Sequence, residues 1–70
     1  MEKLINELVE MAREGEKEVL IAYNLKGELS IYENYQIDYI DENLQVGVID
    51  LEAYNTKEDI KEELEDMLED

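Results

Sequence analysis

The chain contains neither cysteine nor histidine, and this absence restricts how its 70 residues can be stabilised. A disulfide framework and a zinc site of the cysteine and histidine kind are both excluded. A domain of this size buries only about 60% of the surface that its unfolded chain exposes, so such links usually help it. Apolar packing, alone or with a partner or a second copy, therefore has to hold one domain over residues 1 to 70. The hydrophobic fraction of 44% is near the globular average and suffices for a core.

Apolar residues at helical spacing predict a helix at each end of the chain. The first covers residues 2 to 14 and stops at Gly15, a residue typical of helix C-termini. The last begins after Asn55 and Thr56, both good N-caps with an acid three residues further on. The apolar stripe of the last helix is narrow and consists of Ile60, Leu64, Met67 and Leu68.

Alternating residues predict strands between the helices. Residues 18 to 25 form the first, with Val19, Ile21, Tyr23 and Leu25 on one face, and the Asn-Leu-Lys-Gly turn at 24 to 27 leads into a return strand at 28 to 33. The runs 35–40 and 44–49 predict a second hairpin across the polar turn 41–43, although residues 28 to 40 could equally form one bent strand. The expected fold class is α+β, with a three- or four-stranded, mostly antiparallel sheet flanked by the N-terminal and C-terminal helices. One face of that sheet is expected to be covered and the other to be wet.

Charge is the most unusual property of the chain. It has 21 acids against six bases, a net charge of −15. Thirteen of these net charges lie after Gly27, and residues 28 to 56 contain seven acids and no base. Such a surface repels nucleic acid and anionic membranes and attracts basic partners.

The candidate partner-binding residues are acids that lie outside the neutralised first third of the chain. Acids in the last helix turns oppose the helix dipole and repel one another, so folding alone does not favour them there. Carboxylates two apart on a strand or four apart on a helix are separated by about 6 to 7 Å, close to the spacing of successive phosphates. The candidates are Glu33, Asp38, Asp41, Glu42, Asp50 and Glu52 on the sheet side and Glu62, Glu65, Asp66 and Glu69 on the last helix.

Tyr32 is the candidate aromatic anchor, because it lies on the opposite sheet face from Leu29 and Ile31. If that face is uncovered, Tyr32 is expected to form an exposed patch there, together with Ile40 and Ile49. Tyr35 and Tyr39 are instead expected to fill the edges of the core.

Other chemistries find little support in the residues. A calcium loop starting at Asp41 lacks the required glycine at its sixth position, which is Val46. Ser30 and Thr56 have no histidine to act as a general base, so we expect no enzyme, no catalytic residue, no metal site and no cofactor. The scattered bases exclude a nucleic-acid-binding surface.

The N-terminal residues do not resemble a signal peptide, and the longest apolar run, residues 19 to 23, is too short to span a membrane. A cytoplasmic location is therefore expected.

These features favour an inhibitor that mimics nucleic acid and occupies the basic site of a target protein. In size and composition the chain is similar to several small phage proteins that block restriction, repair or CRISPR nucleases, so an anti-restriction or anti-CRISPR role is the leading hypothesis. Two alternatives remain: an immunity or antitoxin type of inhibitor of a basic enzyme, and a small homodimeric structural module.

Overall fold

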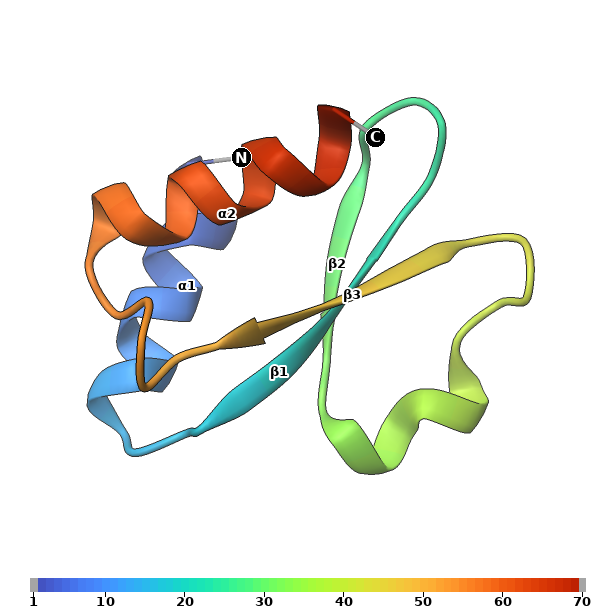
Figure 1. Cartoon of the computed structure of the whole chain (residues 1–70). Coiled ribbons are helices and arrows are strands. Elements are labelled where there is room, and N and C mark those ends of the chain that lie inside the picture. The colour runs from blue at the N-terminus through green and yellow to red at the C-terminus, as the bar shows by residue number, and fades with distance from the viewer. Residues whose placement is uncertain (1, 70) are drawn as a thin grey trace.

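Two helices pack on one side of a three-stranded sheet in the computed structural model, which describes residues 2 to 69 (Figure 1). The predicted α+β class is confirmed, with three strands rather than four. The elements in chain order are α1 (Glu2–Arg13), β1 (Glu18–Tyr23), β2 (Leu29–Tyr32), the 3-10 helix η1 (Asn34–Tyr39), β3 (Gln45–Asp50) and α2 (Lys57–Glu69).

Strand β1 lies in the middle of the sheet and pairs antiparallel with both β2 and β3. On the core side, Ile21 of β1 lies between its register partners, Ile31 of β2 and Gly47 of β3. Residues 19 to 22 of β1 are buried on both faces of the sheet, which explains why they form an unbroken apolar run rather than an alternating one.

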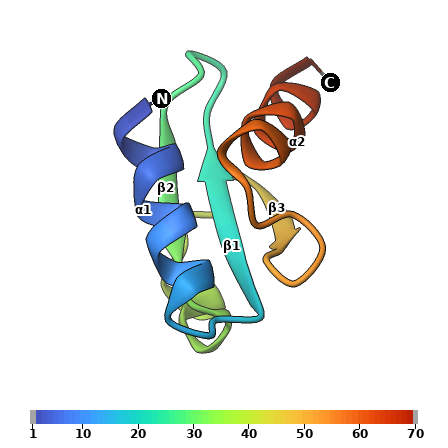
Figure 2. The same cartoon turned by 90° about the vertical axis from the view of Figure 1, so that its left-hand side faces the viewer.

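Both helices cover the same face of the sheet, α1 over β2 and α2 over β3 (Figure 2). The helices also contact each other, so their apolar stripes and the inward strand residues form one core. The residues of this core are Ile5, Leu8, Val19, Ile21, Ile49, Leu51, Ile60 and Leu64.

The helix ends follow the local sequence signals. Gly15 has a φ of 97°, and the N–H groups of Gly15 and Glu16 donate to the carbonyls of Ala12 and Met11, which closes α1 with a Schellman motif. At the start of α2, the Thr56 hydroxyl accepts a hydrogen bond of 3.2 Å from the Asp59 N–H. The predicted stop at Gly15 and the predicted N-cap are therefore both confirmed.

The first hairpin is also confirmed, because its turn is closed by short-range bonds. The Asn24 side-chain oxygen accepts from the N–H groups of Lys26 and Glu28 at 2.9 and 3.0 Å, and Gly27 adopts a φ of 82°. Leu25 was expected to share a strand face with Val19, Ile21 and Tyr23, but it lies in the turn and is 99% exposed.

The second hairpin predicted over residues 35 to 49 is wrong. Strands β2 and β3 flank β1 and both run antiparallel to it, so they are parallel to each other. Two parallel strands cannot be joined by a tight turn and need a crossover of a dozen or more residues. Residues 33 to 44 form this crossover, and η1 lies in its middle, on the opposite side of the sheet from the helices (Figure 1).

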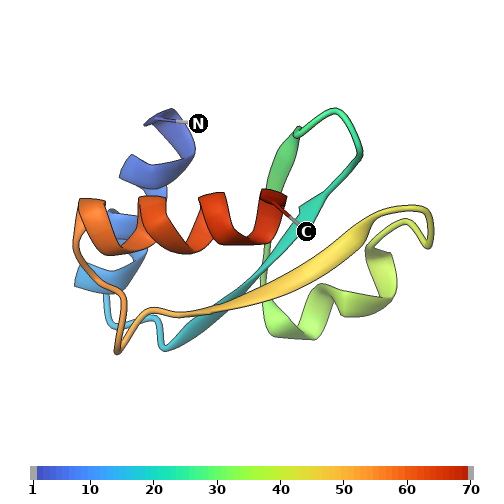
Figure 3. The ribbon, with the colours of Figure 1, turned by 45° about the horizontal axis from the view of Figure 1, so that its top comes forward.

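The direction in which β3 presents its residues also differs from the expectation. Ile49 was expected on an exposed face with Tyr32, but it is fully buried under the helices, because its register partner is Val19 of the core. Val46 and Val48 face the other way. Gly47 lies on the core side beneath α2, where a β-carbon would come within 2.8 Å of the Met67 sulfur. Figure 3 shows α2 lying over the sheet with its C-terminal end toward the β1–β2 hairpin.

Candidate functional site

The side of the sheet away from the helices, here called the open face, is formed by the outward residues of the strands. Register places Tyr32, Leu20 and Val48 in one row across this face and Ser30, Ala22 and Val46 in the next. Leu20 and Ala22 are buried, because β1 is central and η1 packs against it, whereas Val46 and Val48 on the edge strand β3 remain exposed. The open face is thus covered over its middle and bare along β3.

Local hydrogen bonds explain why η1 is helical despite its alternating sequence. The Gln36 side-chain oxygen accepts from the Glu33 N–H at 2.9 Å, and the Gln36 N–H donates back to the Glu33 carbonyl. At the other end, the Ile40 N–H donates to the Ile37 carbonyl. The turn that follows is fixed by Asp41, whose carboxylate accepts from the Asn43 N–H at 2.8 Å.

Five of the predicted site residues lie on one continuous segment, residues 32 to 42, on the same side of the sheet as the open face, here called the open side. Tyr32 ends β2 and is half-buried on the open face. Glu33 precedes η1, Asp38 lies within it, and Asp41 and Glu42 follow it. Asp38, Asp41 and Glu42 are exposed.

Asp50 and Glu52 lie at the end of β3 that is remote from Asp41 and Glu42. Asp50 is the register partner of Glu18, and its carboxylate accepts from the Glu52 N–H at 2.9 Å. The Asn34 amide donates to the Glu18 carboxylate at 2.7 Å, so the first residue of η1 is held at this same end of the sheet.

Three acids that are not among the predicted site residues also lie at this end of the sheet. Glu14, Glu16 and Glu18 line a shallow depression of about 530 Å³ together with Glu33, Lys17 and the start of η1. They were passed over because the first 27 residues are nearly neutral in sum, although Glu14, Glu16 and Glu18 follow one another at alternate positions in the sequence.

The four acids predicted on α2 lie on an ordered, exposed helix surface. With Glu58 added, the glutamates at 58, 62, 65 and 69 are spaced by four, three and four residues and share the helix face opposite to Ile60 and Leu64. Their separations along the helix axis are about 6, 4.5 and 6 Å. Asp66 flanks this row, and the last turn of α2 contains no base. The glutamates 58, 62, 65 and 69 are called the α2 acid row below.

The bases are concentrated in the helix layer. Lys3, Arg13, Lys57 and Lys61 belong to α1 and α2, Lys17 lies in the connection from α1 to β1, and Lys26 lies in the hairpin turn. Within residues 2 to 69 one ion pair is formed, between Lys57 Nζ and Glu2 Oε1 at 3.2 Å, and it joins the two helices. Strands, η1 and the crossover contain no base at all.

The predicted site residues therefore do not form one surface. Tyr32 and four acids lie on the open side, Asp50 and Glu52 lie at one end of the sheet, and four acids lie on the outer face of α2. Two tyrosines were placed wrongly: Tyr35 and Tyr39 do not fill the core edges, because η1 points their side chains into solvent.

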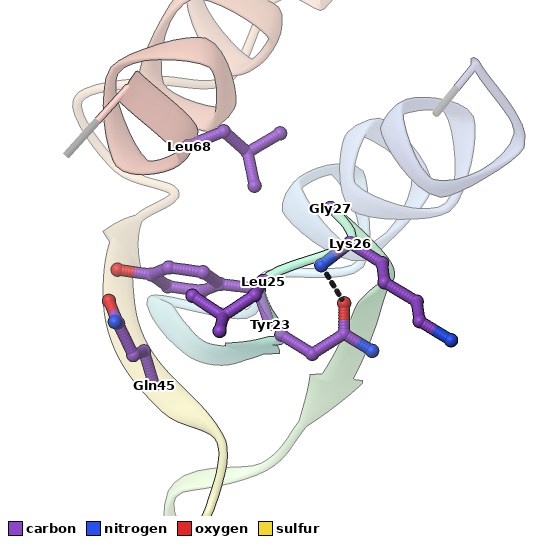
Figure 4. Close-up of a pocket in the computed structure, with 7 residues that line it drawn as sticks. Tyr23, Leu25, Lys26, Gly27, Gln45 and Leu68 are labelled. Atoms are coloured by element: carbon purple, nitrogen blue, oxygen red, sulfur yellow. Dashed lines mark hydrogen bonds between the residues drawn. The ribbon is translucent and has the colours of Figure 1, made fainter.

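A pocket of about 230 Å³ lies between the hairpin turn and the C-terminal end of α2 (Figure 4). Tyr23, Leu25, Gln45 and Leu68 line it, and the bond from the Lys26 N–H to Asn24 closes the turn at its rim. Of the described residues that line it, Lys26 alone is charged, and Figure 4 shows its side chain extending away from Tyr23 and Leu68.

The acids and helices of residues 2 to 69 bear on two other functions, metal binding and membrane insertion. In this part of the chain no three acids converge in a geometry that could hold a metal ion. No helix in it combines the length and apolarity needed to cross a membrane.

Comparison with known proteins gives no relative: no family model, no curated protein and no solved structure matches the chain.

Proposed function

We propose that the protein binds the basic, nucleic-acid-binding surface of another protein and inhibits it by occupying that surface. The observation that carries the proposal is the α2 acid row, four exposed glutamates held at near-regular spacing on a helix that packs into the core. A packed helix fixes the relative positions of its carboxylates, as a nucleic-acid strand fixes its phosphates.

The energetic cost of this arrangement supports a role in binding. Each acid near the C-terminus of a helix opposes the dipole by about 0.3–1 kcal/mol when exposed, and like charges four residues apart add a few tenths. A domain of this size has about 3–5 kcal/mol of stability from its core. A basic partner would remove this repulsion on binding, whereas in the isolated domain it lowers the stability of the fold.

The charge of the remaining surface agrees with the proposal. The open side adds Asp38, Asp41 and Glu42 without any neighbouring base in the chain, so its field reaches a partner with little internal neutralisation. Such a field steers a cationic protein during encounter and weakens as salt is added. Because its size and charge are similar to those of phage proteins that block defence nucleases, host nucleases are the first class of target to examine.

The proposal can be tested with two matched variants that remove the same charge. One variant carries Glu62→Gln, Glu65→Gln and Glu69→Gln on α2. The other carries Glu7→Gln, Glu10→Gln and Glu14→Gln. These three glutamates are exposed; the first two lie on α1 and Glu14 directly follows it. Each variant is immobilised beside the wild type and incubated with a nuclease-treated lysate at low salt, and retained proteins are eluted with a short DNA duplex.

We expect the wild type and the α1 variant to retain basic nucleic-acid-binding proteins that DNA displaces, and the α2 variant to lose most of them. Equal loss by both variants would show that only net charge matters. Retained proteins that DNA fails to displace would contradict nucleic-acid mimicry and favour an inhibitor of the immunity type.

A further inference from the structure

Five of the seven large apolar side chains that are exposed among residues 2 to 69 belong to η1 and to the open face of β3. The other two, Leu25 and Tyr54, lie in the hairpin turn and in the connection before α2. Within η1 the exposed fractions are 77% for Tyr35, 55% for Ile37 and 79% for Tyr39. On the bare edge of the open face they are 41% for Val46 and 53% for Val48. We call these five residues the η1–β3 patch.

Folding does not account for the two tyrosines of the patch. A single exposed apolar side chain is ordinary, but several on the same side of a small protein are typical of an interaction surface. Tyrosine is favoured at such surfaces because it offers a large contact area and a polar hydroxyl at low cost in side-chain entropy. Tyr35 and Tyr39 contribute little to the core, since more than three quarters of each side chain is in water.

Acids border the patch. In a 3-10 helix, residues three apart lie one above the other, so Asp38 lies on the same ridge as Tyr35. Asp41 and Glu42 follow directly, and both are exposed. The crossover and the two strands that it joins contain no base to neutralise these carboxylates.

This charge decides between two possible occupants of the patch. A second copy of the chain would bring the same acids face to face and double a net charge of −15. A partner with an apolar or aromatic group between lysines or arginines would match both the patch and its border. Arginine in particular can pair with the carboxylates and stack on the tyrosine rings.

We propose that the η1–β3 patch is an apolar contact surface for the basic partner, on the side of the sheet opposite to the α2 acid row, and that Asp38, Asp41 and Glu42 form its charged rim. This inference rests on the proposed function and adds to it the chemistry of the partner, an apolar group flanked by bases. Tyr35 and Tyr39, rather than the half-buried Tyr32, are the anchor residues.

Peptides of defined composition can test the inference without knowledge of the natural partner. The ¹⁵N-labelled protein is titrated at low salt with three extended peptides of equal length, one alternating arginine and leucine, one alternating arginine and serine, and one alternating glutamate and leucine. Chemical-shift changes map the contact and give the affinity. The same titrations are repeated with Tyr35→Ser/Tyr39→Ser and with Leu25→Ser, which removes an exposed apolar side chain from the hairpin turn.

We expect the arginine–leucine peptide to bind most tightly and to shift residues 35 to 48. The double tyrosine variant should weaken it by about tenfold or more, and Leu25→Ser should leave it unchanged. Equal binding of the arginine–serine peptide would overturn the inference and leave the proposed function standing. Absence of binding by both arginine peptides would contradict the proposed function itself.

Two further outcomes would overturn the choice of a basic partner. One is binding of the glutamate–leucine peptide as tightly as the arginine–leucine peptide. The other is a concentration-dependent dimer in sedimentation whose contact maps to residues 35 to 48, which would identify a second copy as the occupant.

Discussion

The two faces of the sheet differ in how completely other elements cover them. Under the helices, inward strand residues and the stripes of α1 and α2 close into a core whose members are almost completely buried. On the open face a single 3-10 segment covers the middle strand and leaves two tyrosines, an isoleucine and two valines in water. The comparison teaches that the helix side of the sheet holds the core, whereas the exposed apolar side chains of η1 and β3 lie on the other side.

Charge follows the same division. The helix layer contains four of the six bases and an ion pair between its two helices, whereas the sheet, η1 and the crossover contain none. The outer face of α2 is the exception, because its last two turns carry acids and no base. Variants of matched residues can show how far this division holds.

The largest effect is expected from the covered face. Leu64→Ala removes a fully buried side chain of α2, so the free energy of unfolding should fall by about 2–5 kcal/mol. That loss is comparable to the whole stability expected of such a domain. Val48→Ala on the open face should cost less than about 1 kcal/mol, because half of the side chain is already in water. Urea unfolding followed by circular dichroism measures both, and equal losses would contradict the division.

A smaller effect is expected at the contact between β3 and α2. Gly47→Val places a side chain against Met67, whose sulfur lies 2.8 Å from the position of a new β-carbon. Because the Met67 side chain is flexible and can shift at its far end, the overpacking should cost only about 1 kcal/mol in urea unfolding. Shortening the neighbour with Met67→Ala should return part of that loss, so a double-mutant cycle should give a favourable coupling. Strictly additive effects would show that Met67 does not limit the space at Gly47.

A stabilising change is expected at the C-terminal end of α2. Glu69→Lys replaces an acid in the last turn by a base that suits the helix dipole and follows Glu65 at the favourable spacing of four. The midpoint of thermal unfolding should rise by the equivalent of about 0.3–1 kcal/mol in stability. Added salt should reduce this difference between the variant and the wild type.

Glu7→Lys in the middle of α1 is the matched control, since it changes net charge equally but stands four residues after Lys3. If this control stabilises the protein as much as Glu69→Lys, then total charge, rather than position in the helix, limits stability.

The smallest effect is expected from the ion pair of the helix layer. Lys57 and Glu2 are both largely exposed, so Lys57→Gln should change the free energy of unfolding by less than about 0.5 kcal/mol. A decrease of more than about 1 kcal/mol in the free energy of unfolding, measured with urea, would show that this ion pair stabilises the fold substantially.

Features set by neighbouring residues were predictable from the sequence. The stop at Gly15, the cap at Thr56 and the turn at Asn24 and Gly27 each depend on hydrogen bonds within a few residues. The unbroken apolar run at residues 19 to 22 is also typical of a central strand that is buried on both faces, as β1 is. The excess of acids after Gly27 follows directly from the residues.

Features set by pairing order were not predictable in the same way. The run 35–40 alternates as a strand does, but β3 takes the free edge of β1 and obliges this segment to cross the sheet. The same pairing turns Ile49 into the core and Val46 and Val48 away from it. The exposure of Tyr35 and Tyr39 is a consequence of both.

By itself, the sequence determined the helices, the first hairpin, the fold class and the surplus of negative charge, because these depend on local hydrogen bonds, periodicity and composition. Only the tertiary structure decided which strand lies in the middle, which face of β3 is buried and which tyrosines reach the solvent. Those properties depend on contacts between residues far apart in the chain, where several pairings satisfy the same local pattern and the burial of the whole core selects one.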